Sequence, residues 1–388
     1  MKFALRLKSV FVASILGIFL TSGANAADSV GPAEIAAGDK AIWPEPINET
    51  ATFDKASRAT IRIYFRQLSA MQKLSDAEIL SAFKIKSVNH TALDNWITTE
   101  KSLTIANYQA AAKTCQAGDW TCSAAMEQPP KSAAKAQADQ LNIPAAFADW
   151  AKGVEAFTQA YIGEQMRLAA LFPKVTSEID IFSNIEWTGS TLNDRQFYLT
   201  FDDGPTAPKQ TTDATLDMLA DQHKSAAFFV LGNSFNARQT TTNAKALQSL
   251  YGNQCVALHG WEHQSHAKWD HWEDSIRRTR TLVQATIGDK NTLPLFRPPY
   301  GQRRADSSSF FAAEKLKVAL WNIDSQDWNA KVDANAVEKR IILLMLIKRH
   351  GVILFHDTHP KAKTALPRIF AAVGTAVTWE DCHKLLFF

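Results

Sequence analysis

The sequence has little net charge, few cysteines and only one long apolar run near its start. Its 388 residues include 42 Lys and Arg against 39 Asp and Glu. Three of the basic residues, Lys2, Arg6 and Lys8, lie at the N-terminus, so 39 residues of each sign remain in the rest of the chain. A neutral chain offers no broad electrostatic attraction for nucleic acid or for an anionic membrane surface. We therefore expect no nucleic-acid partner.

The N-terminal apolar run has the organisation of an export signal. It extends from Val10 to Leu20 and is too short to cross a bilayer. It follows the three basic residues and precedes Ala24 to Ala26, a cleavage site made of small residues. We expect residues 1–26 to be a signal peptide that is cleaved after Ala26. The mature chain is then exported to the periplasm or secreted, and it has no membrane span.

Only four cysteines occur, and all of them follow the expected cleavage site. An even number of cysteines in an exported protein favours disulfides. Cys115 and Cys122 enclose a short, turn-rich loop, so we predict a bridge between them. The alternative is a metal site, but their spacing, with no nearby His, is poor for zinc. The sequence leaves open whether Cys255 and Cys382 form a second bridge or stay free.

The first half of the mature chain has the pattern of a helical region. From about residue 52 to 172, apolar residues recur at helical spacing, and Ser75 with Glu78 forms a capping box at a helix start. One apolar stripe contains Phe147, Trp150, Val154, Phe157 and Tyr161. Such a stripe could bind sugars, but at this spacing it is far more typical of a helix face packed in a core. We expect a mainly α-helical N-terminal domain over residues 27–190.

The second half alternates short apolar strands with helices. The predicted strands include 197–200, 226–231, 255–258, 318–323 and 352–355. Near-continuous apolar strands between helices indicate parallel βα units, whose active sites lie at the carboxyl ends of the strands. We therefore expect an α/β domain over residues 191–388, with its chemistry at the strand ends.

The residues that follow these strands suit metal-assisted hydrolysis. His259 and His263 are spaced to share one face of a helical turn and to chelate a metal. One carboxylate of the pair Asp202 and Asp203 can complete the ligand set of a catalytic zinc, and the other can act as general base. His356 is a candidate general acid. Each motif is weak alone, and the prediction depends on their occurring together after strands.

The order of these motifs resembles the polysaccharide deacetylases of the NodB-homology group, carbohydrate esterase family four. The resemblance extends from about Arg195 to Ile369. It implies an irregular (β/α) barrel with fewer than eight full units, preceded here by the mainly helical N-terminal domain. The sequence has no H-E-x-x-H motif of a metalloprotease and no G-x-S-x-G motif of a serine esterase.

The resemblance also implies a role for each candidate residue. Asp202 would be the general base and His356 the general acid, and the metal ligands would be Asp203, His259 and His263. The metal is expected to be Zn²⁺ or another divalent ion such as Co²⁺.

Five further residues would support the reaction by resemblance. Arg297 would hold the base, Tyr300 would offer its backbone N–H to the oxyanion, and Asp327 would tune the general acid. Trp328 and Leu354 would form the wall of the acetate pocket.

The implied reaction is removal of N-acetyl groups from a polymer or oligomer of acetylated amino sugars, of chitin, peptidoglycan or exopolysaccharide type. The alternatives are an O-acetyl xylan esterase with the same metal site and a non-catalytic carbohydrate-binding protein. One departure is Gly260, where the family usually has Ser or Thr, and its missing hydroxyl predicts a looser loop. Glu262 is expected to lie outside the ligand set. Trp261, Trp269 and Trp272 suit sugar stacking and core packing equally.

Overall fold

The computed structural model describes residues 35–38, 40–126, 141–171 and 178–387. The predicted signal peptide, residues 1–26, lies outside these residues. Within the described ranges, no helix has the length and apolar character needed to cross a bilayer. All described residues belong to one unit of the chain, which begins at Pro32.

The helical region is confirmed, and local sequence signals explain its boundaries. Its helices are α1 (Thr50–Met71), α2 (Asp76–Phe83), α3 (His90–Ala112) and α5 (Ala148–Leu171), with a 3₁₀ turn, η2 (Ala145–Phe147), before α5. Ser75 begins α2 as predicted, because its side chain accepts from the backbone of Glu78 while the Glu78 carboxylate accepts from the Ser75 N–H at 2.7 Å. All five residues of the aromatic stripe are buried, so the stripe is core.

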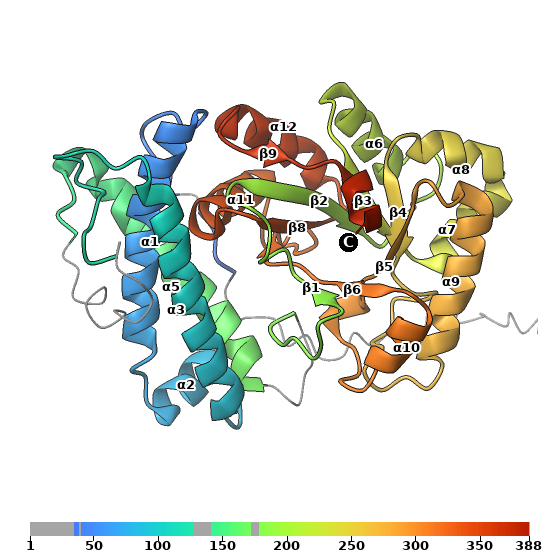
Figure 1. The fold of residues 1–388 in the computed structure, drawn as a ribbon, viewed down its shortest axis with the longest axis horizontal. Coiled ribbons are helices and arrows are strands. Elements are labelled where there is room, and N and C mark those ends of the chain that lie inside the picture. Colours follow the sequence, from blue (N-terminus) through green and yellow to red (C-terminus); the bar gives the residue numbers. More distant parts are fainter. Residues whose placement is uncertain (1–34, 39, 127–140, 172–177, 388) are drawn as a thin grey trace, which may run out of the picture. The chain divides into compact units, whose positions relative to one another are not determined.

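The second half forms one curled sheet in which every strand pair is parallel (Figure 1). The strands are β1 (Glu186–Trp187), β2 (Gln196–Asp202), β3 (Ala226–Val230), β4 (Cys255–Leu258), β5 (Thr292–Phe296), β6 (Lys317–Ala319), β7 (Ile323–Asp324), β8 (Gly351–His356) and β9 (Thr378–Trp379). Their order is β1-β6-β5-β4-β3-β2-β8-β7, with β9 beside β2. The predicted irregular (β/α) barrel is confirmed.

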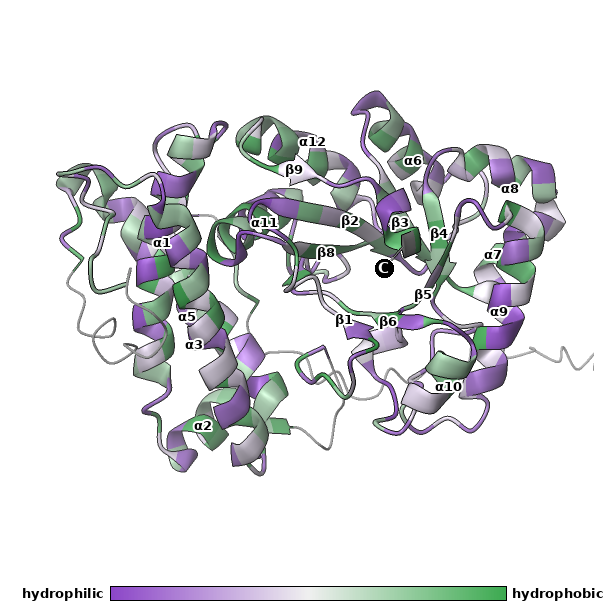
Figure 2. Ribbon diagram, in the orientation of Figure 1, coloured by the Kyte–Doolittle hydropathy of each residue, from purple (hydrophilic) through white to green (hydrophobic). Residues whose placement is uncertain are grey.

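Helices connect these strands and cover the outside of the sheet. They are α6 (Thr211–Asp221), α7 (Gly232–Thr241), α8 (Ala244–Tyr251), α9 (Trp272–Ile287), α10 (Ser308–Ala313), α11 (Ala334–Lys348) and α12 (Lys361–Val373), with two 3₁₀ turns, η3 (Pro299–Gly301) and η4 (Cys382–Phe387). Helices such as α1 and α9 show hydrophilic and hydrophobic bands in Figure 2, as expected for helices that pack by one face.

One predicted strand is wrong in its extent. The segment 318–323 is two short strands, β6 and β7, that pair at different ends of the strand order. Between them the ladder is interrupted because the carbonyls of Ala319 and Leu320 accept from the guanidinium of Arg297, each at 3.1 Å. The Asn322 side chain in turn accepts from the Val352 N–H at 2.9 Å. An apolar pattern does not reveal such a break, since its cause lies in a distant side chain.

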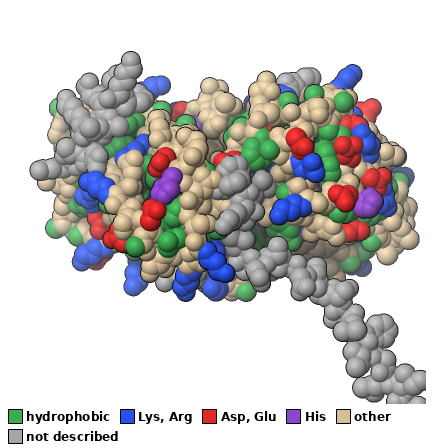
Figure 3. Space-filling view, turned by 90° about the horizontal axis from the view of Figure 1, so that it is seen from below, with side chains coloured by type: hydrophobic (Ala, Val, Ile, Leu, Met, Phe, Trp, Pro, Cys, Tyr) green, Lys and Arg blue, Asp and Glu red, His purple; other side chains and the backbone are tan. Residues whose placement is uncertain are grey.

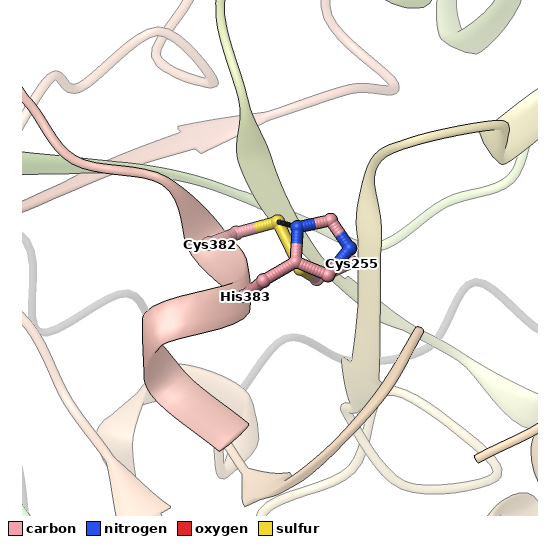
Figure 4. A group of neighbouring side chains, drawn as sticks. All are labelled: Cys255, Cys382 and His383. Atoms are coloured by element: carbon pink, nitrogen blue, oxygen red, sulfur yellow. Dashed lines mark hydrogen bonds between the residues drawn. A yellow bond between two sulfur atoms is a disulfide. The ribbon is translucent and has the colours of Figure 1, made fainter. Parts of the chain in front are cut away.

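The interior of the curled sheet is filled by side chains and closed by the C-terminal turn. The interior cluster includes Trp187, Tyr198, Phe229 and Leu354, and η4 contributes Leu385 to it. A disulfide joins Cys382 at the start of η4 to Cys255 at the start of β4 (Figure 4). The structure also joins Cys115 to Cys122, the pairing that the sequence favoured.

The helical region packs against α11 through paired charges. Helices α1 and α3 contact α11, and three buried ion pairs join the two regions. These pairs are Asp54 with Arg349, Glu100 with Lys348 and Glu164 with Arg340. On the face drawn in Figure 3, basic and acidic side chains are interspersed, in keeping with the balanced charge of the sequence.

Candidate active site

The candidate residues gather where parallel strands end at the same edge of the sheet. Asp202 ends β2 and His356 ends β8, and the two are register partners on adjacent strands. His259 directly follows β4, Arg297 directly follows β5, and Asp327 lies three residues after β7. Because carboxyl ends of parallel strands share one edge, five separate segments contribute to one site.

Three side chains at this edge could hold a divalent cation. The Asp203 Oδ1 atom lies 3.3 Å from the Nε2 of His259 and 3.4 Å from the Nε2 of His263. These three atoms all lie within 4.8 Å of one another. The Asp203 Oδ1 is buried and, among the described residues, has no hydrogen-bond partner. A buried acceptor without a partner is costly, so this donor set fits a cation of the kind that two His and one carboxylate hold.

The two histidines do not lie on a helical turn, contrary to the prediction. Residues 259–265 form a loop of bends. Gly260 in this loop has a backbone φ of +85°, a value that residues other than glycine rarely adopt. This left-handed residue turns the chain back, so that both imidazoles face Asp203. The two imidazoles therefore come together, but through a different local geometry from the predicted helical turn.

The orientation of the two rings suits metal binding. The Nδ1 of His259 donates to the carbonyl oxygen of Arg297 at 2.7 Å, which leaves Nε2 as the ring nitrogen that faces Asp203. Burial lowers the pKa of His263 to about 4, against the opposing effect of Asp203. Burial alone would raise the pKa of Asp203, but the contact with His259 and the other nearby imidazoles outweigh it and lower the pKa. The candidate ligand atoms are thus two imidazole nitrogens and a carboxylate oxygen.

Asp202 is held by a fully buried arginine. The Arg297 NH1 donates to Asp202 Oδ1 at 2.8 Å and to the Thr200 hydroxyl at 2.8 Å. The guanidinium lies over the ring of Phe229, 4.0 Å from its centroid. Arg297 has no exposed surface, and Asp202 is 3% exposed. This pairing fixes the Asp202 carboxylate in one orientation beside the ligand group, with its Oδ2 3.9 Å from His259 Nε2.

Asp327 holds His356 through two contacts. The Asp327 Oδ1 lies 2.7 Å from the Nδ1 of His356, and Oδ2 accepts from the His356 backbone N–H at 3.0 Å. Burial lowers the pKa of His356, but the charge and hydrogen bond of Asp327 outweigh it and raise the pKa to about 10. His356 is therefore a protonated imidazolium at neutral pH, with its Nε2 free of the Asp327 contact.

Two aromatic residues are exposed at this site. Tyr300 is 46% exposed, and its ring packs edge-on against His263 with the centroids 4.4 Å apart. Trp328, beside Asp327, is 42% exposed. Leu354, by contrast, is buried in the interior of the sheet. The structure thus places Tyr300 and Trp328 on the surface beside the candidate ligands and the candidate acid.

The place of the missing hydroxyl at Gly260 is filled by other residues. A Cβ at Gly260 would lie 2.8 Å from the ring of His266 and 3.0 Å from the hydroxyl of Ser275. That hydroxyl accepts from the Trp261 N–H at 2.6 Å and so supports the loop. The Ser275 hydroxyl thus supports the loop where the family's own hydroxyl is missing, and the looser loop stays a prediction. Glu262, as expected, is exposed and lies outside the ligand set.

The three tryptophans near the site differ in their surroundings. Trp272 is core, with its ring 4.6 Å from that of Phe310. Trp261 lies beneath the guanidinium of Arg278 at 4.0 Å. Trp269 is partly buried against the core.

Sequence reasoning missed two residues of the site. Thr200 binds Arg297 and donates to the Ile353 carbonyl at 2.8 Å. Its position two residues before Asp202 on the same strand face was the available signal. Asp357 is buried against Gly204, where a Cβ would lie 2.1 Å from its Oδ2, and burial raises its pKa to about 7. Nothing in the sequence distinguishes Asp357 from a surface residue after His356.

A second group of potential ligands is a disulfide site instead. Cys255, Cys382 and His383 lie together, with the His383 Nδ1 3.9 Å from the Cys382 sulfur (Figure 4). The two sulfur atoms are bonded to each other, so neither is a thiolate that could bind a metal.

Comparison with known proteins identifies the class of this region. Residues 189–321, about a third of the chain, match the model of a family described as polysaccharide deacetylase. The predicted resemblance to polysaccharide deacetylases is therefore confirmed for this part of the chain. The matched region contains Asp202 and Tyr300 and the metal-ligand candidates between them, but it ends before Asp327 and His356.

Curated relatives share the same region. The chain is 31% identical over 182 residues to peptidoglycan-N-acetylmuramic acid deacetylase PdaC of Bacillus subtilis, a match that covers 46% of this chain and 35% of that protein. It is 29% identical to peptidoglycan-N-acetylglucosamine deacetylase of Bacillus cereus, and this match covers 44% of this chain and 63% of that protein. It is 30% identical to a bifunctional xylanase/xylan deacetylase of Cellvibrio japonicus, and this match covers 44% of this chain and 24% of that protein. The chain thus spans less than two thirds of each of these relatives.

Solved structures of similar proteins include a peptidoglycan N-acetylglucosamine deacetylase, at 21% identity and a TM-score of 0.46. That match covers 52% of this chain and 93% of the other. A family 4 carbohydrate esterase from Streptomyces lividans matches at 27% identity with a TM-score of 0.41. This match covers 48% of this chain and 92% of the other.

Proposed function

We propose that this protein is a metal-dependent hydrolase that removes N-acetyl groups from a polysaccharide or oligosaccharide containing N-acetylglucosamine. One observation carries the proposal. The group of Asp203, His259 and His263 has a buried oxygen without a partner among the described residues, and the same sheet edge carries Asp202, held by Arg297, and His356, held by Asp327. A base, a cation site and an acid at one edge are the parts that hydrolysis of an amide requires.

The cation would be held by Asp203, His259 and His263. A divalent ion such as Zn²⁺ or Co²⁺ would supply Lewis-acid activation of water and of the acetyl carbonyl. Two imidazoles and one carboxylate would leave coordination positions open for substrate and water, as in catalytic zinc sites.

The protein side chains would move the protons. Asp202, oriented by Arg297, takes the proton of the attacking water. The backbone N–H of Tyr300 donates to the negative charge that develops on the oxygen of the acetyl carbonyl. His356, kept charged by Asp327, gives its proton to the departing amine.

The charged state of His356 favours an amide over an ester as the substrate. An amine is a poor leaving group and needs a proton, whereas an alcohol needs it less. The alternative, an O-acetyl xylan esterase, is supported by the likeness to xylan deacetylases. A non-catalytic carbohydrate-binding protein is not favoured, because the sequence has lost none of the candidate ligands and keeps both the candidate base and the candidate acid.

The exposed aromatic rings support a sugar substrate. Tyr300 and Trp328 offer flat apolar surfaces beside the site, and sugar rings stack on such surfaces. Trp328 and Leu354 would line the pocket for the acetyl group. The relatives named for peptidoglycan and for chitooligosaccharides suggest acetylated amino-sugar polymers or oligomers as substrates.

We further propose that residues 1–26 direct export, that 27–190 form the helical N-terminal domain and that 191–388 form the catalytic domain. The two disulfides suit a periplasmic or secreted protein.

The test is release of acetate from N-acetylglucosamine oligomers and, in parallel, from acetylated xylan. Each assay uses metal-stripped protein, zinc-restored protein and the zinc-restored Asp202→Asn variant. The proposal predicts zinc-dependent release from the oligomers that the substitution abolishes. Release from xylan alone would assign the protein as an esterase, and release that is unaffected by metal removal would refute the proposed site.

A further inference from the structure

A buried ion pair, Glu164 with Arg340, connects the helical region to the turn before Asp327 in the candidate active site. Glu164 lies on α5, and its carboxylate binds the guanidinium of Arg340 on α11 in a two-pronged arrangement. The Oε1–NH1 distance is 3.0 Å and the Oε2–NH2 distance is 2.7 Å. The two side chains are 4% and 1% exposed. This geometry leaves the guanidinium little freedom to rotate.

The third donor of the same guanidinium holds the end of a strand. The Nε of Arg340 donates to the carbonyl oxygen of Asp324 at 2.8 Å. Asp324 is the last residue of β7, and its carboxylate accepts from both the backbone N–H and the side-chain amide of Gln326, at 2.8 and 2.7 Å. Gln326 has a φ of +57°, a left-handed conformation that is uncommon for a residue with a side chain. The turn is therefore stabilised by the Asp324 carboxylate within it and by Arg340 from outside it.

This turn leads directly to the residue that holds the proposed acid. Asp327 follows Gln326 and makes both contacts with His356, at Nδ1 and at the backbone N–H. The direction of the Asp327 carboxylate depends on the turn before it. A tilt of the turn would therefore lengthen the contact with Nδ1 and turn the imidazole.

We propose that Glu164 and Arg340 are positioning residues, through which helix α5 of the N-terminal region sets the orientation of Asp327 and His356. The inference rests on the proposed function, because it assigns α5 to the proton-transfer step of that reaction. The helical region then acts in catalysis without touching the substrate. Neither Glu164 nor Arg340 lies within the family match at 189–321, so the matched domain alone does not contain this device.

A neighbouring ion pair provides a matched control. Glu100 on α3 pairs with Lys348 on the same helix α11, at 2.5 Å, and its side chain is 7% exposed. Among the described residues, Lys348 contacts Glu100 and the Tyr161 ring, both in the helical region. Glu100→Gln therefore makes the same chemical change at the same junction without touching the turn before Asp327.

The experiment compares Glu164→Gln with Glu100→Gln on two substrates. One is an N-acetylglucosamine oligomer, whose amine must be protonated as it leaves. The other is 4-nitrophenyl acetate, whose leaving group needs no proton. We expect Glu164→Gln to lower kcat on the oligomer by about 10-fold or more at unchanged KM, and to change hydrolysis of the aryl acetate by less than about twofold. We expect Glu100→Gln to change both rates by less than about twofold.

A double variant separates positioning from stability. Replacing a buried ion pair by apolar residues of similar size is often neutral for folding, so Glu164→Leu combined with Arg340→Met keeps the interface packed. It removes the hydrogen bond to the Asp324 carbonyl, and we expect the same selective loss on the oligomer.

A readout that needs no activity completes the test. The Nδ1 proton of His356, hydrogen-bonded to Asp327, is followed by ¹H NMR in metal-free protein, with His356→Gln for assignment. The inference predicts that this resonance shifts in Glu164→Gln and in the double variant but not in Glu100→Gln. Equal changes in the two single variants, or no change in any, would overturn it. If the unsubstituted protein released no acetate from the oligomer, the proposed function would fail and the resonance alone would decide this inference.

Discussion

The substitution Asp327→Asn tests how the proposed acid keeps its proton. The asparagine has nearly the same shape and can still accept from the His356 backbone N–H, but it removes the negative charge 2.7 Å from Nδ1. Burial, which lowers the pKa of His356, is then opposed only by the weaker effects of the Asp203 and Asp202 charges. We expect the pKa to fall from about 10 to below the ordinary 6.5.

The size of the effect follows from the fraction of protonated imidazole. At pH 8, a group with a pKa of about 10 is almost fully protonated, whereas one with a pKa of 6.5 or less is at most about 3% protonated. The variant should therefore lose at least about 30-fold in kcat on an N-acetylglucosamine oligomer at pH 8. The loss should grow by about tenfold per pH unit above pH 6.5 until the unsubstituted protein itself loses its proton.

The assay is kcat for acetate release between pH 6 and 10 at equal metal loading. Asp333→Asn is the matched control, because Asp333 caps the start of α11 and asparagine caps a helix equally well. A loss that is the same at every pH would refute the reasoning, because it would mean that the Asp327 charge does not set the protonation of His356.

The raised pKa of His356 also predicts that the stability of the metal-free protein depends on pH. The folded protein holds the pKa of His356 above its unfolded value, so the stabilisation is complete below pH 6.5 and is lost as the pH rises toward 10. Between pH 6 and pH 9 the unfolding free energy should fall by roughly 3 kcal/mol, because His356 loses its proton in the unfolded chain but keeps it in the folded protein. Asp327→Asn should not show this fall. Urea unfolding at the two pH values measures it, and equal differences for both proteins would contradict it.

Three further predictions concern the disulfide, the ligands and the loop. The bridge between Cys255 and Cys382 closes 127 residues, so replacing both with serine should lower the unfolding free energy by about 4–5 kcal/mol in urea titration; a loss under about 1 kcal/mol would contradict this. Asp203→Asn should weaken zinc binding by more than about 100-fold in a competition with a chelator, and unchanged affinity would remove Asp203 from the ligand set. Gly260→Ser should destabilise the protein by about 1–3 kcal/mol, because φ is +85° and a Cβ would meet His266 at 2.8 Å; a gain in stability would refute that account.

The sequence was most informative where chemistry and strand ends coincide. Asp202, His259 and His356 each end or follow an apolar strand, and parallel pairing alone brings such residues to one edge. The capping box at Ser75 and the buried stripe around Trp150 also follow from local patterns, so the structure contains them as predicted.

The features that the sequence did not reveal depend on contacts between distant residues. The break between β6 and β7 is caused by the Arg297 guanidinium, which binds carbonyls more than twenty residues away. The replacement of a hydroxyl at Gly260 depends on His266 and Ser275, which only the folded loop brings together. The link from Glu164 to Arg340 spans 176 residues, and neither residue belongs to a motif.

Zinc-dependent deacetylation is the central claim, and one measurement tests it most directly. Metal-stripped protein is titrated with Zn²⁺ in the presence of an N-acetylglucosamine oligomer, and acetate and free amine are measured together. The account predicts that both products appear in equal amounts, that the rate rises until one zinc is bound per chain, and that Asp202→Asn binds the same zinc without forming either product. Acetate without free amine, or full activity before zinc is added, would contradict it.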